Sequence, residues 1–348
     1  MSPYTSTILY LSLGLGTMIT LTSSHWLLAW MGLEINTLAI IPLMARHRHP
    51  RAVEATTKYF LTQATAAAMI LFASTTNAWF TGEWDIIYMH HPIATKILIM
   101  ALALKMGLAP LHFWLPEVLQ GISLTTGLVL STWQKLAPLA LLFQVAHAAE
   151  PLLLLTLGLS STLIGGWGGM NQTQLRKILA YSSIAHLGWL IIVINIAPQL
   201  ALITLIVYII MTSALFLAFE LTKSTMTSTL ALAWTKNPTM AATTTLVLLS
   251  LGGLPPLTGF IPKWLILQEL TKQGYPVIST LIALTALLSL FFYTRLCYTM
   301  ALTITPSTNN ASAFWRLPNT QPTLPLAIST AMAIGLLPLT PAIMSLTP

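Results

Sequence analysis

Charged side chains are scarce in this sequence. Only 7% of its 348 residues are charged, while 55% are hydrophobic. A soluble domain carries about 25% charged residues, so this composition excludes a water-exposed surface over most of the chain. A helix of about 20 apolar residues is enough to cross a bilayer. We therefore predict an all-α, polytopic membrane protein in which residues 1–348 form a single transmembrane domain.

Cysteine is nearly absent too, since Cys297 is the single one. Disulfides, structural zinc sites and iron–sulfur clusters all need several thiols. Neither a metal-ligand spacing, a serine–histidine–acid set nor a nucleotide-binding fingerprint is found. The sequence thus predicts no metal and no cofactor in this chain. A basic leader is missing as well, so residues 1–22 are interpreted as a first membrane span and not as a cleaved presequence.

Long apolar runs fill the rest of the chain. They predict about eleven spans, near residues 3–22, 25–45, 55–80, 93–115, 124–146, 151–170, 175–196, 199–221, 240–271, 276–303 and 323–346. Two of these spans contain glycine and proline, at Gly107 and Pro110 and at Gly253 and Pro256. Because proline removes a helix donor and clashes with the preceding turn, we expect both spans to kink or unwind. No internal repeat is evident.

Basic residues favour one side of the predicted membrane domain. With eleven spans, one set of loops holds most of them: Arg46, Arg48, Arg51, Lys58, Arg176, Lys177, Lys223, Lys236 and Arg316. Basic loops face the inside of membrane proteins. The amino terminus is therefore predicted to lie inside and the carboxyl terminus outside.

Four of the ionisable residues in the predicted spans are the informative ones. Glu34, Lys105 and Lys135 fall near the centres of their spans, and Lys263 follows the proline pair of the interrupted ninth span. Each such placement costs about 2.5–3.5 kcal/mol. One interpretation is a static Glu34–Lys105 ion pair that locks two helices together. Since four buried groups exceed what one pair needs, we favour proton handling by Glu34, Lys105, Lys135 and Lys263.

Two histidines are candidate proton relays because imidazole titrates near neutral pH. His112 follows Lys105 by seven residues, two turns along the same face if the helix continues. His186 lies at the centre of its span. The alternative for each is a histidine that simply hydrogen-bonds a neighbouring helix. Glu117 could serve a proton entrance or, equally, end a helix.

Glycines gather at two places in the predicted spans. The run Gly165–Gly169 resembles a phosphate loop only superficially, because it lacks the following lysine and a preceding strand. We predict close helix packing there. The same interpretation applies to Gly14 and Gly16.

Several long segments resemble a known family. They are residues 25–37, 105–117, 131–138, 171–186 and 251–264, which include HWLLAWMGLEINT, KMGLAPLHFWLPE, STWQKLAP and LGGLPPLTGFIPKW. These motifs are similar to those of the chain 2 family of NADH–ubiquinone oxidoreductase, the antiporter-like membrane-arm subunits of respiratory complex I. The similarity runs along essentially the whole chain.

The resemblance implies an antiporter-like fold with broken helices and a proton-translocating subunit of complex I in the mitochondrial inner membrane. Glu34 with Lys105, then Lys135 and Lys263, match the row of charged residues of that family. The NADH, flavin, iron–sulfur and ubiquinone sites would belong to other subunits. The expected partners are other membrane-arm subunits and lipids, with no nucleic acid.

Two other functions remain open from the residues. A free-standing cation/proton antiporter would use the same buried groups, although a sodium site favours carboxylates and only Glu34 is deep in a span. In a purely structural subunit, the same buried charged residues would form permanent ion pairs.

Overall fold

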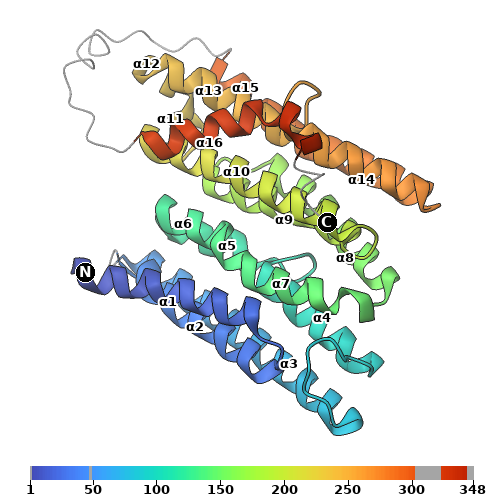
Figure 1. Ribbon diagram of the computed structural model, residues 1–348. Coiled ribbons are helices and arrows are strands. Elements are labelled where there is room, and N and C mark those ends of the chain that lie inside the picture. Colours follow the sequence, from blue (N-terminus) through green and yellow to red (C-terminus); the bar gives the residue numbers. More distant parts are fainter. Residues whose placement is uncertain (1, 47–48, 302–322, 343–348) are drawn as a thin grey trace. The chain divides into compact units, whose positions relative to one another are not determined.

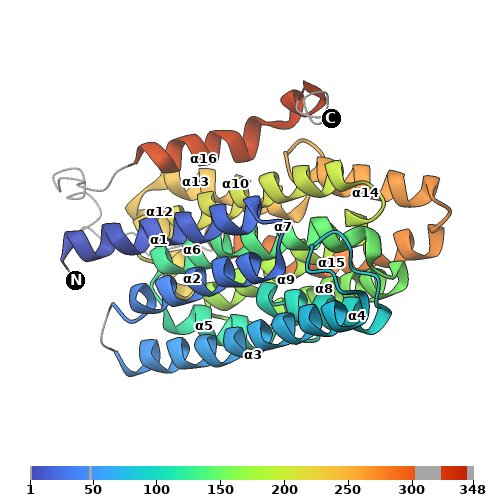
Figure 2. The same ribbon diagram turned by 60° about the horizontal axis from the view of Figure 1, so that its bottom comes forward.

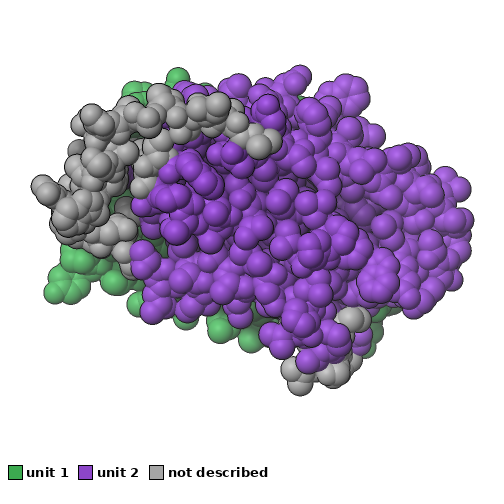
Figure 3. Space-filling model, turned by 90° about the horizontal axis from the view of Figure 1, so that it is seen from above, with its two compact units in different colours: residues 1–158 green, residues 159–348 purple. Residues whose placement is uncertain are grey.

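The computed structural model describes residues 2–46, 49–301 and 323–342. Within these ranges all regular elements are helices, and β-type pairing is limited to two isolated bridges (Figure 1). The predicted all-α class is therefore confirmed. The chain divides into two compact units, residues 1–158 and residues 159–348 (Figure 3). Each unit is described by itself.

Unit 1 is built from long helices followed by short ones. Its helices are α1 (Pro3–Thr22), α2 (Trp26–Met44), α3 (Pro50–Thr81), α4 (Pro92–Met106), α5 (Trp114–Gly121), α6 (Leu124–Ser131), η1 (Trp133–Lys135), α7 (Leu136–Val145) and η2 (Ala146–Ala148). Helix α1 packs on α2, while α3 packs on α2, α4 and α5 (Figure 2). This packing places α2, α3 and α4 side by side around the candidate site.

Helix α8 (Pro151–Met170) leads into unit 2. The other helices of unit 2 are α9 (Leu175–Ile194), α10 (Pro198–Thr222), α11 (Thr227–Ala231), α12 (Ala233–Lys236), α13 (Pro238–Gly252), α14 (Phe260–Lys272), α15 (Pro276–Ala301), α16 (Leu324–Gly335) and η4 (Leu337–Leu339). Helix α10 packs on α9, α13 and α16, and α13 packs on α15. The core of unit 2 thus forms around α10 and α13.

Most of the described helices lie within a few residues of the predicted spans, whereas the short helices α11 and α12 lie between two of them. Among the described residues, six helical runs are long and apolar enough to cross a membrane: α1, α2, residues 124–148, α8, α10 and α15. Helices α13 and α16 are apolar but shorter. The count of about eleven crossings therefore stays a prediction. Arg48, Arg316 and the ends of the last two predicted spans lie outside the described residues.

Both expected interruptions are present. Helix α4 ends at Met106 and is capped by Gly107, whose φ is 77°, and α5 begins only at Trp114. Helix α13 ends at Gly252 and is capped by Gly253, whose φ is 83°, and α14 begins at Phe260. A left-handed backbone costs other residues about 1–2 kcal/mol, so glycine is the favoured residue at both ends. The predicted unwinding is confirmed at both sites.

The two interruptions repeat one sequence pattern. Residues 107–111 and 253–257 both read Gly-Leu-x-Pro-Leu. Leu108 N donates to Ala103 O at 2.9 Å, and Leu254 N donates to Leu249 O at 3.4 Å, so each leucine closes the end of its helix in the same way. The similarity covers five residues at each site, so the expectation that the chain has no internal repeat of greater length stays a prediction. A single short motif builds the break in each unit.

A third interruption was not predicted. The fifth span was expected to be one helix, but α6 ends at Ser131 and a 3₁₀ turn, η1, precedes α7. Pro138 provides the physical reason, because its ring removes a donor and crowds the carbonyl of Gln134 four residues earlier. Lys135 therefore lies at a break and not within a regular helix.

The glycine run packs tightly, as predicted. A Cβ added at Gly165, Gly166, Gly168 or Gly169 would meet Ala185, Leu288, Tyr181 or Phe292, respectively. Ala185 and Tyr181 lie on α9, and Leu288 and Phe292 lie on α15. Helix α8 therefore packs closely against both α9 and α15 through its glycines. Gly16 likewise lies against Gly32 and Asn36 of α2, whereas a Cβ at Gly14 would meet nothing within 4 Å. The packing role is thus right for Gly16 and wrong for Gly14.

Candidate functional site

Unit 1 contains a small cavity that Lys105 and Lys135 both line. Its volume is about 10 Å³, close to the room that one water molecule needs. The uncharged polar side chains around it are Asn36, Thr37, Tyr59, Gln63 and Gln134. Two basic groups, neutral polar groups and room for water are components of a proton-transfer path.

Lys105 lies in the last turn of α4, two residues before the left-handed Gly107. Its side chain is buried, with 6% relative exposure. Within the described part of the chain, Nζ has no hydrogen-bond partner. The backbone around it is held firmly, because Trp114 Nε1 donates to Leu104 O at 3.0 Å across the break. The fold therefore presents an ammonium group to the cavity on a rigid support.

Lys135 ends the 3₁₀ turn η1 and is also buried, with 3% relative exposure. The neighbouring Gln134 donates from Nε2 to Asn36 O at 3.3 Å, which ties this turn to α2. Trp133 Nε1 reaches Leu13 O of α1 at 3.5 Å. The two residues that precede Lys135 thus tie η1 to α1 and α2 by hydrogen bonds.

Glu34 lies half-buried on α2. Its Oε2 accepts a hydrogen bond from Thr37 at 3.1 Å, and its charge interacts electrostatically with Lys105 and Tyr59. Among the described ion pairs within 4.0 Å, none joins Glu34 to Lys105. The direct Glu34–Lys105 pair considered from the sequence is therefore not formed, and the two groups interact over a longer distance.

Lys263 belongs to unit 2 and lies in the first turn of α14. Its Nζ donates to Leu251 O at 3.3 Å and to Gly252 O at 2.9 Å. These carbonyls end α13, and the last carbonyls of a helix lack intrahelical partners and carry partial negative charge. The ammonium group of Lys263 on α14 therefore caps the carbonyl end of α13, the other half of the broken span.

The two candidate histidines occupy different environments. His112 is buried in the irregular segment between α4 and α5, with its ring 4.4 Å from that of Phe113. The expectation that it lies two turns along the face of Lys105 is wrong, because the helix ends at Met106. His186 is half-buried on α9, where the Tyr293 hydroxyl lies 3.4 Å from its Nε2.

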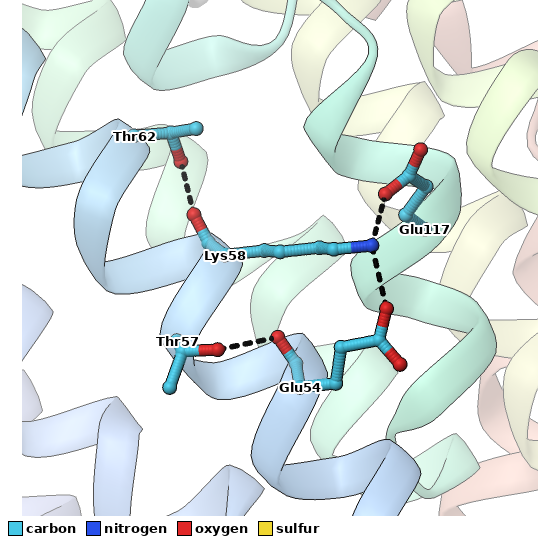
Figure 4. A network of polar contacts seen from close by, with 5 residues as sticks. All are labelled: Glu54, Thr57, Lys58, Thr62 and Glu117. Carbon is cyan, nitrogen blue, oxygen red and sulfur yellow. Dashed lines mark hydrogen bonds and ion pairs between the residues drawn. The ribbon is translucent and has the colours of Figure 1, made fainter.

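Glu117 takes part in an exposed ion network (Figure 4). Lys58 Nζ lies 2.7 Å from Glu54 Oε1 and 2.7 Å from Glu117 Oε2, which joins α3 to α5. The hydrogen bond from Lys58 lowers the pKa of the Glu54 carboxyl. Exposed pairs contribute little stability, so this network mainly orients the start of α5. Glu117 lies inside α5 and does not end a helix, and its role at a proton entrance stays a prediction.

Sequence reasoning missed the neutral side chains around the cavity. Asn36 is the clearest case, because it is 2% exposed and neither amide atom has a hydrogen-bond partner among the described residues. Tyr59 and Gln63 lie four residues apart on α3 and so share one face. A polar residue inside an apolar run was the available signal, but only the packing of α2, α3 and α4 shows that these residues meet.

Metal ligands were not expected, and within residues 2–46, 49–301 and 323–342 no group of three or more His, Cys, Asp or Glu side chains could hold a metal ion. That this chain binds no cofactor remains a prediction.

Two family models match the chain. The model of the NADH:quinone oxidoreductase/Mrp antiporter transmembrane family matches residues 23–289, and that of the NADH dehydrogenase subunit 2 C-terminus matches residues 290–344. The chain is 69% identical over 346 residues to NADH-ubiquinone oxidoreductase chain 2 of Salmo salar, covering 99% of both chains. It is 68% identical to that of Carassius auratus, covering 100% of both chains.

Solved structures share the fold. A chain of respiratory complex I from Thermus thermophilus superposes with a TM-score of 0.85 at 27% identity, over 99% of this chain and 80% of that chain. A chain of the Mrp complex from a Dietzia species gives a TM-score of 0.83 at 17% identity, over 97% of this chain and 75% of that chain. At 17% identity, the similarity to the Mrp chain shows a common fold and nothing more.

Proposed function

The chain belongs to the NADH-ubiquinone oxidoreductase chain 2 family, and we propose that its buried glutamate and lysines carry protons across the membrane. As a member of this family it has an antiporter-like membrane fold and is a proton-translocating subunit of NADH:ubiquinone oxidoreductase, respiratory complex I. The proposal concerns which residues move the protons: Glu34, Lys105, Lys135 and Lys263, with His112 and His186 as relays.

One observation carries this proposal. Lys105 and Lys135 come from different helices and are both buried on a single cavity with room for water. Burying an ammonium group is costly, and an apolar residue would fill the same space in the protein without that cost. The neutral side chains of Asn36, Gln63 and Gln134 could hold a water molecule between the two lysines. That water would pass a proton from one ammonium group to the neutral amine of the other.

Glu34 supplies the adjustable charge in this scheme. A carboxylate near a buried lysine favours its charged form, and removal of that charge favours proton release. Because Glu34 acts on Lys105 without a direct ion pair, a change in its own protonation could alter the charge of Lys105 without breaking a contact. Moving one charge against about 100 mV costs about 2.3 kcal/mol. The energy would come from quinone reduction in other subunits.

Membership of this family also suggests the topology, location and partners of the chain. We propose that residues 1–348 form one transmembrane domain with about eleven crossings. It would lie in the mitochondrial inner membrane with its amino terminus in the matrix and its carboxyl terminus in the intermembrane space. The basic loops support this orientation. Other membrane-arm subunits and lipids would surround it, and NADH, flavin, iron–sulfur clusters and ubiquinone would bind elsewhere in the complex.

Native electrophoresis of gently solubilised membranes tests the assembly. We expect an antibody to this chain to label the same band that stains for NADH dehydrogenase activity. Migration of the chain as a small species, clear of that band, would contradict the proposal. A free-standing cation/proton antiporter would then be the better assignment.

A further inference from the structure

The C-terminal helix α16 has no part in the proposed path, yet its last turn meets the broken span of unit 2. Helix α16 packs on α10 and α13 (Figure 2), and its buried residues Leu326, Thr330 and Ala333 share one face. The helix ends at Gly335, and the last four carbonyls of a helix lack partners within it. The buried carbonyl of Ala333 therefore needs a donor from another part of the protein.

Thr258 supplies that donor. It is buried in the segment 253–259, which separates α13 from α14, and its Oγ1 donates to Ala333 O at 2.5 Å. Pro255 and Pro256 in this segment have no N–H group, and irregular backbone at membrane depth is tolerated only where protein or a watery cavity surrounds it. The hydrogen bond from Thr258 thus attaches the irregular segment to α16.

The position of Thr258 also bears on Lys263, through the start of α14. Thr258 O accepts from Ile261 N at 3.4 Å in the first turn of α14, and Lys263 lies in the same turn. On the other side, a Cβ added at Gly259 would overlap the carbonyl of Ser250 on α13. The bond to α16 therefore holds the turn from which Lys263 reaches back to α13.

Lys263 tolerates little movement of that turn. Its Nζ donates to Gly252 O at 2.9 Å and to Leu251 O at 3.3 Å, and a Cβ added at Gly253 would lie 2.9 Å from its Cδ. The side chain thus lies directly across the end of α13. A shift of the turn by about 1 Å would take both carbonyl oxygens out of hydrogen-bond range.

We propose that Thr258 is a positioning residue, which bonds the end of α16 and so holds Lys263 on the carbonyl end of α13. Thr258 itself neither gains nor loses a proton, since its hydroxyl hydrogen stays directed at Ala333 O. Helix α16 is then a brace for the broken span. The importance of this brace for translocation rests on the proposed function of Lys263.

The matched variants Thr258→Ala and Thr258→Ser test the inference in the assembled oxidoreductase. Both remove the methyl group of Thr258, but only serine keeps the hydroxyl donor. We expect Thr258→Ala to slow proton translocation through this subunit about tenfold, the effect of one hydrogen bond to a charged group, and Thr258→Ser to keep the rate. Thr330→Ala is the control, because this buried hydroxyl bonds Leu326 O and Ala327 O of its own helix, and it should also keep the rate.

The reactivity of Lys263 provides a readout that does not depend on translocation. An amine-reactive ester is added to the solubilised complex, and the labelled lysines are counted by mass spectrometry. We expect Thr258→Ala to raise the labelling rate of Lys263 about tenfold, because the amine leaves its carbonyl acceptors. Thr258→Ser should leave it unchanged. Lys272, which is exposed on the same helix, is the internal reference and should react equally in all variants.

Equal labelling of Lys263 in the alanine and serine variants would overturn the inference, whatever the translocation rate. Faster labelling with an unchanged translocation rate would confirm the positioning and contradict the proposed function of Lys263. Should Thr258→Ala not assemble, Thr258→Val keeps the volume and takes its place. If neither variant assembles while Thr258→Ser does, the hydroxyl serves the fold as a whole and the inference fails.

Discussion

Replacing Lys105 by methionine is expected to slow proton translocation through this subunit by about a hundredfold or more, the usual contribution of a group that transfers protons. Lys105 lines the cavity and its Nζ lacks a hydrogen-bond partner within the described residues. Methionine has a similar length and no charge. The measurement is the number of protons moved per NADH oxidised by the purified complex in sealed vesicles.

Assembly should be unaffected by the same substitution. A buried ammonium group without a partner carries a desolvation penalty, and replacing such a group by an apolar one is often neutral or stabilising. The amount of complex on a native gel should therefore match that of the unmodified protein. Lys96→Met, which removes a lysine from an exposed pair with Glu150, is the control and should keep the full ratio. A normal ratio in the Lys105 variant would show that this lysine is not on the path.

Gly259→Ala is expected to prevent assembly of the subunit. Gly259 is buried in the segment between α13 and α14, where an added Cβ would overlap the carbonyl of Ser250. The obstacle is backbone and not a flexible side chain, so the two halves of the broken span must separate. Overpacking of this kind destabilises by about 3 kcal/mol or more. The amount of this chain in the active band of a native gel measures the effect.

The control for this substitution lies in the same unit. A Cβ added at Gly335 of α16 would meet nothing within 4 Å, so Gly335→Ala should leave the band unchanged. Wild-type amounts of active complex with Gly259→Ala would mean that the α13–α14 segment is not packed as described.

Much of the helical framework could be predicted from local patterns. Residues 3–22 and 151–170 form helices at the predicted bounds, because an apolar run bounded by polar residues determines where a membrane helix begins and ends. The breaks at Gly107 and Gly253 were also predictable, since glycine followed by proline cannot continue a helix. The break at η1 was missed because Pro138 lies three residues after Lys135, and its effect on Gln134 was not considered.

The candidate site was only half predictable. Lys105 and Lys135 stand out in the sequence because charge inside an apolar run is rare. Their common cavity depends on how α2, α3 and α4 pack, and no local pattern encodes which faces meet. The prediction that His112 and Lys105 share one helix face was wrong, because it assumed a regular helix across a segment that unwinds. Tyr293 was overlooked because a tyrosine in an apolar helix looks like packing until its partners are known.

The most direct test of the central claim is the proton-to-NADH ratio of assembled complex carrying Lys135→Met. This lysine is buried on the cavity and lies at the break where α6 gives way to α7. The proposed path predicts a normal amount of complex, continued NADH oxidation and fewer protons moved per NADH. An unchanged ratio in fully assembled complex would contradict the path and would favour a structural role for the buried charges.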